Sequence, residues 1–385
     1  MTVYFDLSAA VHPRAGLGRY SESLARALVP LLGERLGFFY NTEEGIQPLS
    51  GLESFPTRTV SLGYKPWRMA VWLGQLAHVP FNRLLSGAEL YHATEHLLMH
   101  LHRVPTVLTV HDLIFRRYPA HHKPLNRWYL NLTMPLYCRR ATHVIAVSRQ
   151  TKRDLMDAYG VASEKITVIY EAAGSDFAPQ SPEAIATART RYNLPERYIL
   201  SVGTIEPRKN LGRVLTAFER LHDENLVNAF VIVGKKGWLY DDFLAQLDRS
   251  PVKHAVIFPG WVSDADLPAV YAGSAAVAFP SDFEGFGLPV LEGMACGAPV
   301  LCSNTSSLPE IAGDAALLVD PADTGAITAG LRRILCEPQL SAELRRRGRE
   351  QAARFSWERA AAETVKVYER LSARPGTQYL PDHQW

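Results

Sequence analysis

The chain of 385 residues has little of what marks a secreted, metal-binding or membrane-spanning protein. Its four cysteines form no CxxC pair, so the sequence offers neither a zinc knuckle nor a thioredoxin-type site. Its first residues lack the basic and apolar segments of a signal peptide, and no apolar run reaches the ~18 residues of a membrane span. A net charge of only +2 gives no reason to expect a nucleic-acid partner. These absences predict a cytoplasmic protein with isolated, reduced thiols.

Short apolar runs alternate with longer amphipathic stretches along the whole chain, a pattern typical of βαβ units and of parallel sheets covered on both faces. The expected strands are TVYFDL, RLGFFY, ELYHAT, TVLTVHD, THVIAVS and KITVIY in the first half, and YILSVG, AFVIVG, HAVIFPG, AAVAFP, APVLCS and AALLVD in the second. At roughly 100–200 residues per domain, two domains are expected. The stretch 172–197 is rich in Ala, Ser, Pro and Gly at its start and separates the two sets of strands. We therefore predict an α/β protein of two doubly wound domains, residues 1–178 and 190–356.

Gly16 and Gly18 lie in AGLGRY, after the first predicted strand and before a helical pattern. Glycines there let the backbone approach a ligand, and the start of a helix offers N–H groups to an anion. Ser21 stands where a dinucleotide fingerprint has its third glycine, so a plain tight turn explains the segment as well as a phosphate site does.

A second candidate segment runs from Gly203, at the end of a predicted strand, to Arg208, Lys209 and a predicted helix. Ligands of open α/β sheets bind at the carboxyl ends of the strands, and these two cations suit a diphosphate. The alternative is a solvated helix N-terminus. It is disfavoured because cations oppose the helix macrodipole there unless an anion lies between them.

The third segment, DFEGFGLPVLEGMACG over 282–297, follows the strand AAVAFP. Gly285 and Gly287 bracket Phe286, and such a turn presents backbone N–H groups at the start of a helix. Glu284 in the loop and Glu292 in the helix suit a sugar and a ribose, because a carboxylate accepts two hydroxyl donors well. Two acids that merely favour the helix dipole are the alternative, which fits Glu284 better than Glu292.

With these segments in order, the sequence resembles the retaining glycosyltransferases of family four, which have the GT-B fold of two facing Rossmann-like domains with an interdomain cleft. The resemblance extends from residue 16 to about 310 and is carried by Gly16-Leu17-Gly18, Val110-His111-Asp112, Val147-Ser148, Gly203 to Asn210, and Glu284-Gly285-Phe286-Gly287-Leu288-Pro289 with Glu292 eight residues after Glu284. The last element is the family's E-x7-E motif and the most specific of the five. The resemblance also implies that a C-terminal helix at about 357–373 packs back on the first domain.

The resemblance implies a role for each candidate residue. Arg208 and Lys209 would hold the donor diphosphate and Glu292 the ribose. Glu284 would bind the transferred sugar, with His111 beside the reacting carbon. Further contacts would come from Gly16, Gly18, Gly203, Phe286, Gly287, Leu288 and Val290, and the nucleobase would pack near Trp261 and Val262. Two departures are Thr204, where many relatives have Arg, and Glu171, where they often have Asn.

By the same resemblance, the acceptor attacks on the face that the diphosphate leaves, and the anomeric configuration is retained. We expect no divalent metal and no cofactor besides the nucleotide-sugar donor. His111 has a structural alternative, a strand-end histidine bonded to a carbonyl, and the adjacent Asp112 is a candidate to orient it.

The acceptor side of the chain is basic and aromatic. Between Arg116 and Arg153 there are nine Lys or Arg and no Asp or Glu, and the stretch 64–73 carries two Trp and two basic residues. One interpretation is peripheral contact with anionic lipid at the inner face of the membrane, or with a lipid-linked glycan. The other is two amphipathic helices whose apolar faces belong to the core.

Two other enzyme classes stay open from the sequence. A nucleotide-sugar epimerase would share the fold, and an NAD(P)-dependent oxidoreductase is opposed by the incomplete glycine fingerprint. The form of the 203–210 segment looks like that of bacterial mannosyltransferases. GDP-mannose is therefore the first expectation for the donor and UDP-glucose the second.

Overall fold

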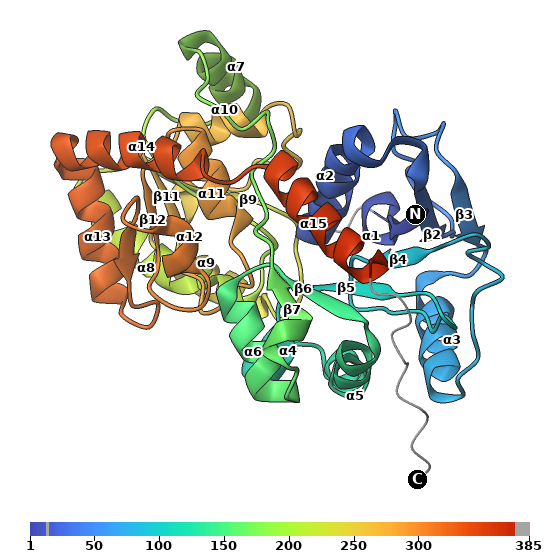
Figure 1. Cartoon of the computed structure of the whole chain (residues 1–385). Helices are drawn as coiled ribbons and strands as arrows, with labels where there is room; N and C mark the ends of the chain where they lie inside the picture. Colours follow the sequence, from blue (N-terminus) through green and yellow to red (C-terminus); the bar gives the residue numbers. More distant parts are fainter. Residues whose placement is uncertain (13–14, 374–385) are drawn as a thin grey trace.

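The computed structural model describes residues 1–12 and 15–373 and consists of two parallel β-sheets, each flanked by helices (Figure 1). The first sheet has the strand order β3-β2-β1-β4-β5-β6-β7, and every pairing in it is parallel. Its strands are β1 (Val3–Asp6), β2 (Leu36–Asn41), β3 (Thr57–Val60), β4 (Leu90–Ala93), β5 (Thr106–Val110), β6 (His143–Ala146) and β7 (Ile166–Val168).

The second sheet has the order β10-β9-β8-β11-β12-β13 and is also parallel throughout. Its strands are β8 (Tyr198–Val202), β9 (Ala229–Val233), β10 (Val256–Ile257), β11 (Ala276–Phe279), β12 (Val300–Ser303) and β13 (Leu317–Val319). The two-domain α/β prediction is confirmed. Each of the twelve expected runs holds one strand, and only β3, an exposed edge strand, was missed.

The helices cover both faces of each sheet, as parallel strands with buried faces require. In the first domain they are α1 (Ser8–Val11), α2 (Ala15–Leu32), α3 (Tyr64–Leu76), α4 (Ile114–Arg117), α5 (Pro124–Arg140) and α6 (Arg149–Tyr159). After it come α7 (Pro182–Tyr192), α8 (Leu211–Asp223), α9 (Asp241–Arg249), α10 (Leu267–Ala272), α11 (Leu288–Ala295), α12 (Leu308–Ala312), α13 (Thr324–Cys336), α14 (Pro338–Ala352) and α15 (Trp357–Ser372). Short 3₁₀ turns are η1 (Gly33–Arg35), η2 (Pro119–His121), η3 (Ser163–Lys165), η4 (Pro207–Lys209) and η5 (Lys253–Ala255).

The last helix, α15, leaves the second domain and packs on α2 of the first (Figure 1). The ring of Trp357 meets that of Tyr20 edge-on, and the Tyr368 hydroxyl lies 2.6 Å from Nδ1 of buried His92. The chain therefore crosses between the domains twice, once before α7 and once before α15. Helix α7, which occupies most of the stretch between the two expected domains, packs against α10 of the second.

All four cysteines are free thiols, and only Cys336 is exposed. Within residues 1–12 and 15–373, no helix is both long and apolar enough to cross a membrane.

Candidate active site

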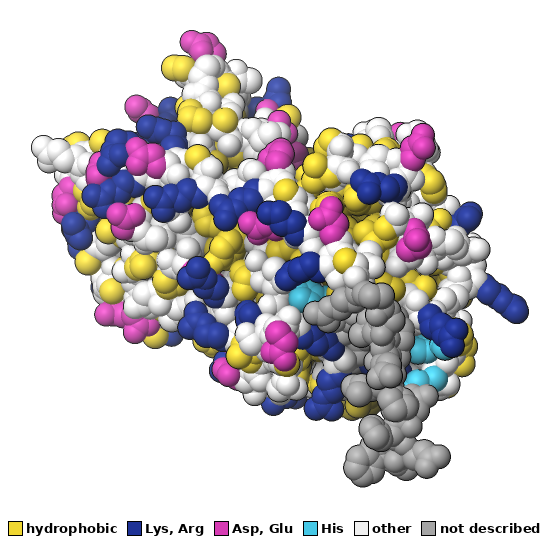
Figure 2. Space-filling view, in the orientation of Figure 1, with side chains coloured by type: hydrophobic (Ala, Val, Ile, Leu, Met, Phe, Trp, Pro, Cys, Tyr) yellow, Lys and Arg dark blue, Asp and Glu magenta, His cyan; other side chains and the backbone are white. Residues whose placement is uncertain are grey.

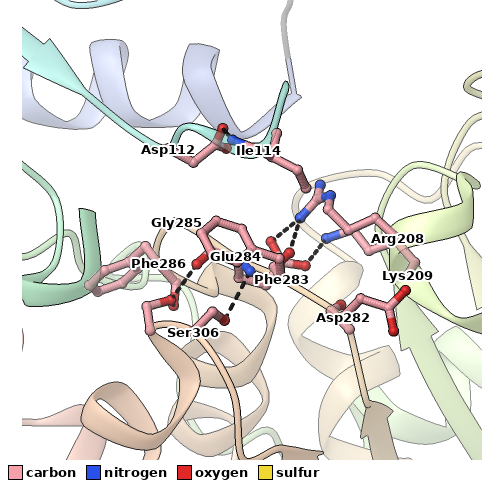
Figure 3. A network of polar contacts seen from close by, with 12 residues as sticks. Asp112, Ile114, Arg208, Lys209, Asp282, Phe283, Glu284, Gly285, Phe286 and Ser306 are labelled. Atoms are coloured by element: carbon pink, nitrogen blue, oxygen red, sulfur yellow. Dashed lines mark hydrogen bonds and ion pairs between the residues drawn. The ribbon is translucent and has the colours of Figure 1, made fainter. Parts of the chain in front are cut away.

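Arg208, Lys209 and Glu284 converge where β8 and β11 end, at the junction of the two domains (Figure 3). Arg208 donates to a carboxylate oxygen of Glu284 and to the carbonyl of Phe283 at 2.9 Å. Nζ of Lys209 lies 2.7 Å from the other Glu284 oxygen. Although burial alone would raise it, the pKa of Glu284 is lowered to about 2 because both cations adjoin it. The site thus holds a permanently ionised carboxylate between two cations.

A second carboxylate, Glu206, also binds Arg208, so the four charges of this cluster cancel. The anion that these two cations were expected to face is supplied here by the carboxylates of Glu284 and Glu206. Burial and the charge of Arg208 lower the pKa of Lys209, while Glu284 opposes the shift. An arriving diphosphate would meet cations that are already positioned by carboxylates.

The loop over 282–287 is held by two serines of the segment before α12. Ser306 Oγ accepts from the N–H of Glu284 at 3.0 Å, and the Ser307 hydroxyl lies 2.9 Å from the carbonyl of Glu284 and 2.8 Å from that of Phe286 (Figure 3). Gly287 has φ of +111°, a conformation that glycine adopts without strain. Leu288 and Val290 follow in the first turn of α11, with Val290 buried, so the glycine turn does open a helix as expected.

Glu292 is buried in α11 and reaches the first domain. One of its oxygens accepts from the Tyr271 hydroxyl at 2.8 Å, and the other forms an ion pair with Arg19 of α2. Arg19 also lies 3.3 Å from Asp264. The charge of Glu292 is the main reason that the pKa of Arg19 is raised. Arg19 was missed as a candidate from the sequence, although it directly follows Gly18.

The glycine segment near the N-terminus is not a loop before a helix, and that expectation is wrong. Gly16 and Gly18 lie in the first turn of α2, which begins at Ala15. A Cβ on Gly18 would lie 3.0 Å from the carbonyl oxygen of Ala9, whereas one on Gly16 would meet nothing within 4 Å. Gly18 therefore permits close packing of α2 on α1, a reason that the pattern of glycines alone does not reveal.

His111 is buried at the end of β5, and both of its ring nitrogens have partners. Nδ1 lies 3.0 Å from Glu171, and Nε2 lies 3.0 Å from the carbonyl of Thr94. Burial lowers its pKa, but the hydrogen bond and charge of Glu171 outweigh that effect and raise it overall. Asp112 instead caps the N–H of Ile114 at 2.9 Å, so the residue that orients His111 is Glu171 and not its neighbour (Figure 3).

The remaining candidates differ in exposure. Gly203 has φ of +140°, and a Cβ there would lie 3.3 Å from Cε of Lys209, so the lysine side chain runs past this glycine. Trp261 is 83% exposed, and its indole is free to stack on a ligand. Val262 beside it is a core residue. The part of the chain that the structure describes contains no cluster of His, Cys, Asp or Glu suited to a metal ion.

The two domains meet directly at this site. A Cβ on Gly285 would lie 2.0 Å from the carbonyl oxygen of His111, so only glycine fits at the contact. The hydroxyl of Thr151 lies 2.9 Å from that same carbonyl and 3.4 Å from the carbonyl of Gly285. Further from the centre, the Trp238 indole donates to the carbonyl of His121 at 2.7 Å. His111 and Glu284, predicted from distant segments, are thereby brought to one place.

Two facing Rossmann-like domains with a carboxylate–cation cluster at their junction define a glycosyltransferase of the GT-B class. More narrowly, the chain belongs to the family whose models match it, "Glycosyltransferase Family 4" over residues 14–173 and "Glycosyl transferases group 1" over residues 185–351. The predicted family, fold and enzyme class are confirmed. The family matches therefore favour a glycosyltransferase over the epimerase and the oxidoreductase.

Relatives support this membership over the full length. The chain is 31% identical to O-antigen chain mannosyltransferase B of Escherichia coli, over 96% of this chain and all of that protein. It is 32% identical to an MMP alpha-(1->4)-mannosyltransferase of Mycolicibacterium hassiacum, over 70% of this chain and 66% of that protein. Among solved structures, Anabaena Alr3699/HepE in complex with UDP-glucose superposes with a TM-score of 0.76 at 19% identity, over 96% of this chain and 100% of that chain.

Proposed function

We propose that the protein is a retaining mannosyltransferase that uses GDP-mannose and acts on a sugar or lipid-linked glycan. The observation that carries the proposal is the full-length similarity to an O-antigen chain mannosyltransferase, together with the cluster of Arg208, Lys209 and Glu284.

In this proposal the donor lies across the ends of β8 and β11. Its diphosphate takes Arg208 and Lys209, with N–H groups of Gly18, Leu288 and Val290 nearby. Glu284 and the backbone of Phe286 and Gly287 hold the hexose. Glu292 accepts from the ribose hydroxyls, and the base stacks on Trp261. Arg19, which forms an ion pair with Glu292, would be a further cation beside the nucleotide.

The chemical step forms a bond between the acceptor oxygen and the anomeric carbon and breaks the bond from that carbon to the diphosphate oxygen. Negative charge grows on the leaving diphosphate, and preorganised cations stabilise it most when water is excluded. The acceptor proton passes to the leaving phosphate oxygen on the same face, which accounts for retention. Glu171 keeps His111 oriented toward the sugar, and no divalent metal takes part.

Calorimetric titration with GDP, UDP and ADP, followed by transfer assays with GDP-mannose, tests this function. We expect GDP to bind most tightly, and nuclear magnetic resonance of the product to show an α-linked mannose. Tighter binding of UDP, with transfer from UDP-glucose, would replace the proposed donor. Turnover of the donor sugar to an isomer without acceptor would overturn transfer itself.

A further inference from the structure

Helices α3 and α5 of the first domain expose apolar side chains in line along each helix. On α3 the exposed residues are Met69, Leu73 and Leu76, and on α5 they are Leu125, Trp128 and Leu132. Spacings of three and four residues place each set on a single helical face. Eight of the fourteen large hydrophobic side chains exposed in the described structure fall within residues 62–79 and 125–132, so this exposure is concentrated and not scattered.

These exposed residues are additional to the core face of each helix. Helix α3 buries Trp67 and Val71, and α5 buries Tyr129, Leu130 and Met134 among others. Each helix therefore has one apolar face inside the protein and apolar residues on its outer face. The interpretation that the apolar residues of these helices belong to the core explains the inner face and leaves the exposed residues unexplained.

Side chains join the two helices into one surface, which we call the α3–α5 surface. The ring of Trp72 meets that of Trp128 edge-on, with centroids 6.2 Å apart. Arg68 donates to the side-chain oxygen of Asn126 at 3.0 Å. The exposed Leu73 and Trp128 thus flank a direct contact between the helices.

Helices α3 and α5 contribute cations and no carboxylate to this surface. Residues 54–88 and 113–153, which contain the two helices, have no Asp or Glu. They contain thirteen cations: Arg58, Lys65, Arg68, Arg83, Arg116, Arg117, Lys123, Arg127, Arg139, Arg140, Arg149, Lys152 and Arg153. Lys65 and Lys123, both exposed, stand at the start of the two helices. In Figure 2, Lys and Arg are seen along the lower edge of the molecule, where Figure 1 places α5 and α6.

We propose that the α3–α5 surface docks the protein on an anionic lipid bilayer. Exposed Leu, Met and Trp enter the interface between headgroups and acyl chains, while the surrounding cations pair with anionic headgroups. Trp128 suits this depth, because indole rings favour the membrane interface. A second copy of the chain is the poorer occupant, since α3 and α5 of two copies would bring cations together and supply no carboxylate of their own to pair them.

Docking through this surface would orient the transferase relative to the membrane. Only this statement about orientation rests on the proposed function. Docking brings the first domain, the expected acceptor side, to the membrane that carries a lipid-linked glycan. Binding to lipid is measured without any sugar transfer, so the two proposals fail separately.

Flotation of the full chain with vesicles tests the proposal. We expect it to float with phosphatidylglycerol–phosphatidylethanolamine vesicles at low salt, and not with phosphatidylcholine vesicles. The pair Leu73→Ser and Leu125→Ser, both at exposed positions, should weaken binding about tenfold or more. Leu31→Ser, an exposed leucine of α2 in the same domain, is the matched control and should bind as the parent does.

Charge is tested separately by Lys65→Glu with Lys123→Glu, which should also release the protein. Arg220→Glu with Lys366→Glu, exposed cations away from this surface, is the control. Equal flotation of all variants, or none by the parent at low salt, overturns the proposal. Concentration-dependent dimers that dissociate in the leucine variant, without lipid binding, would assign the surface to a second copy instead.

Discussion

The two domains have the same strand order and differ in how their charged residues are paired. Both sheets run 3-2-1-4-5-6 in the order of their own strands, and the first adds a seventh at its edge. The second domain pairs its surface charges, as on α14, where Arg346 and Arg347 each bind Glu343. The first leaves α3 and α5 without a carboxylate for tens of residues. One fold can therefore carry a charge-balanced cluster at the junction and helices without carboxylates elsewhere, because the sheet does not dictate what its helices expose.

The largest effect is expected from the second domain's cluster. Lys209→Ala should lower kcat/KM for the donor by about 100–1,000-fold, because it removes a preorganised charge at the leaving diphosphate. Lys253→Ala, which affects a surface ion pair in the same domain, should leave the rate unchanged. Steady-state kinetics with saturating acceptor measure both. A loss below about tenfold, roughly 1.4 kcal/mol, would contradict the assigned role.

Gly285→Ala tests whether the domains must meet as they do here. The added methyl would lie 2.0 Å from the carbonyl oxygen of His111, so the junction must open. We expect kcat/KM to fall about 10–100-fold through misplacement of the reacting groups. Gly174→Ala, whose Cβ would lie at an ordinary 3.5 Å from the Phe177 ring, is the control. Small-angle scattering should show the first variant expanded, and unchanged rate and scattering would mean that the contact is dispensable.

A smaller effect should follow from Arg19→Met, which removes the cation that Glu292 receives from the first domain. Glu292 is buried, but Arg19 is 38% exposed and solvent screens the pair. The expected loss in the free energy of unfolding is about 1–2 kcal/mol. Arg191→Met removes the more exposed Arg191–Asp266 pair within the second domain and should produce no measurable change. Urea denaturation compares the two, and equal losses would remove the distinction between them.

The smallest effect concerns pH. The pKa of His111 is raised, so its pair with Glu171 stabilises the folded protein fully below the ordinary histidine pKa of about 6.5 and loses this contribution as pH rises through the raised value. Glu171→Gln should lower the pKa of His111, because burial then acts without the opposing charge of Glu171, and imidazole chemical shifts follow the change. His122 is the internal control. Burial lowers its pKa, so the folded protein loses stability as pH falls below about 6.5, and Glu171→Gln should not change that.

The pattern of apolar residues was sufficient to predict the strands of the two sheets, because strands buried on both faces appear in the sequence as continuous apolar runs. It missed β3 because TRTV at an exposed edge carries no such run. Gly16 and Gly18 were expected in a loop that approaches a ligand, but both lie in the first turn of α2, where Gly18 packs against Ala9 of α1.

The site was predictable where a motif places charge beside a strand end, as with Arg208, Lys209 and Glu284. Pairings across the junction were not, because Arg19 and Glu292 are 273 residues apart and no local pattern joins them. Asp112 was likewise only a candidate partner for adjacent His111, and the fold instead brings Glu171 from the end of the first domain to it. Exposure of Trp128 and Leu73 was undecidable from spacing, since a helix with two apolar faces gives the same sequence pattern as a buried one.

The return of α15 has a consequence for biosynthesis. Tyr368 and Trp357, which close over His92 and Tyr20, are the last part of the described chain to leave the ribosome. The domain that is translated first is thus completed last, after the whole of the other has emerged and had time to fold. Ribosome-bound chains ending shortly before Trp357 should therefore hold a folded second domain beside a first domain in which His92 is not yet covered.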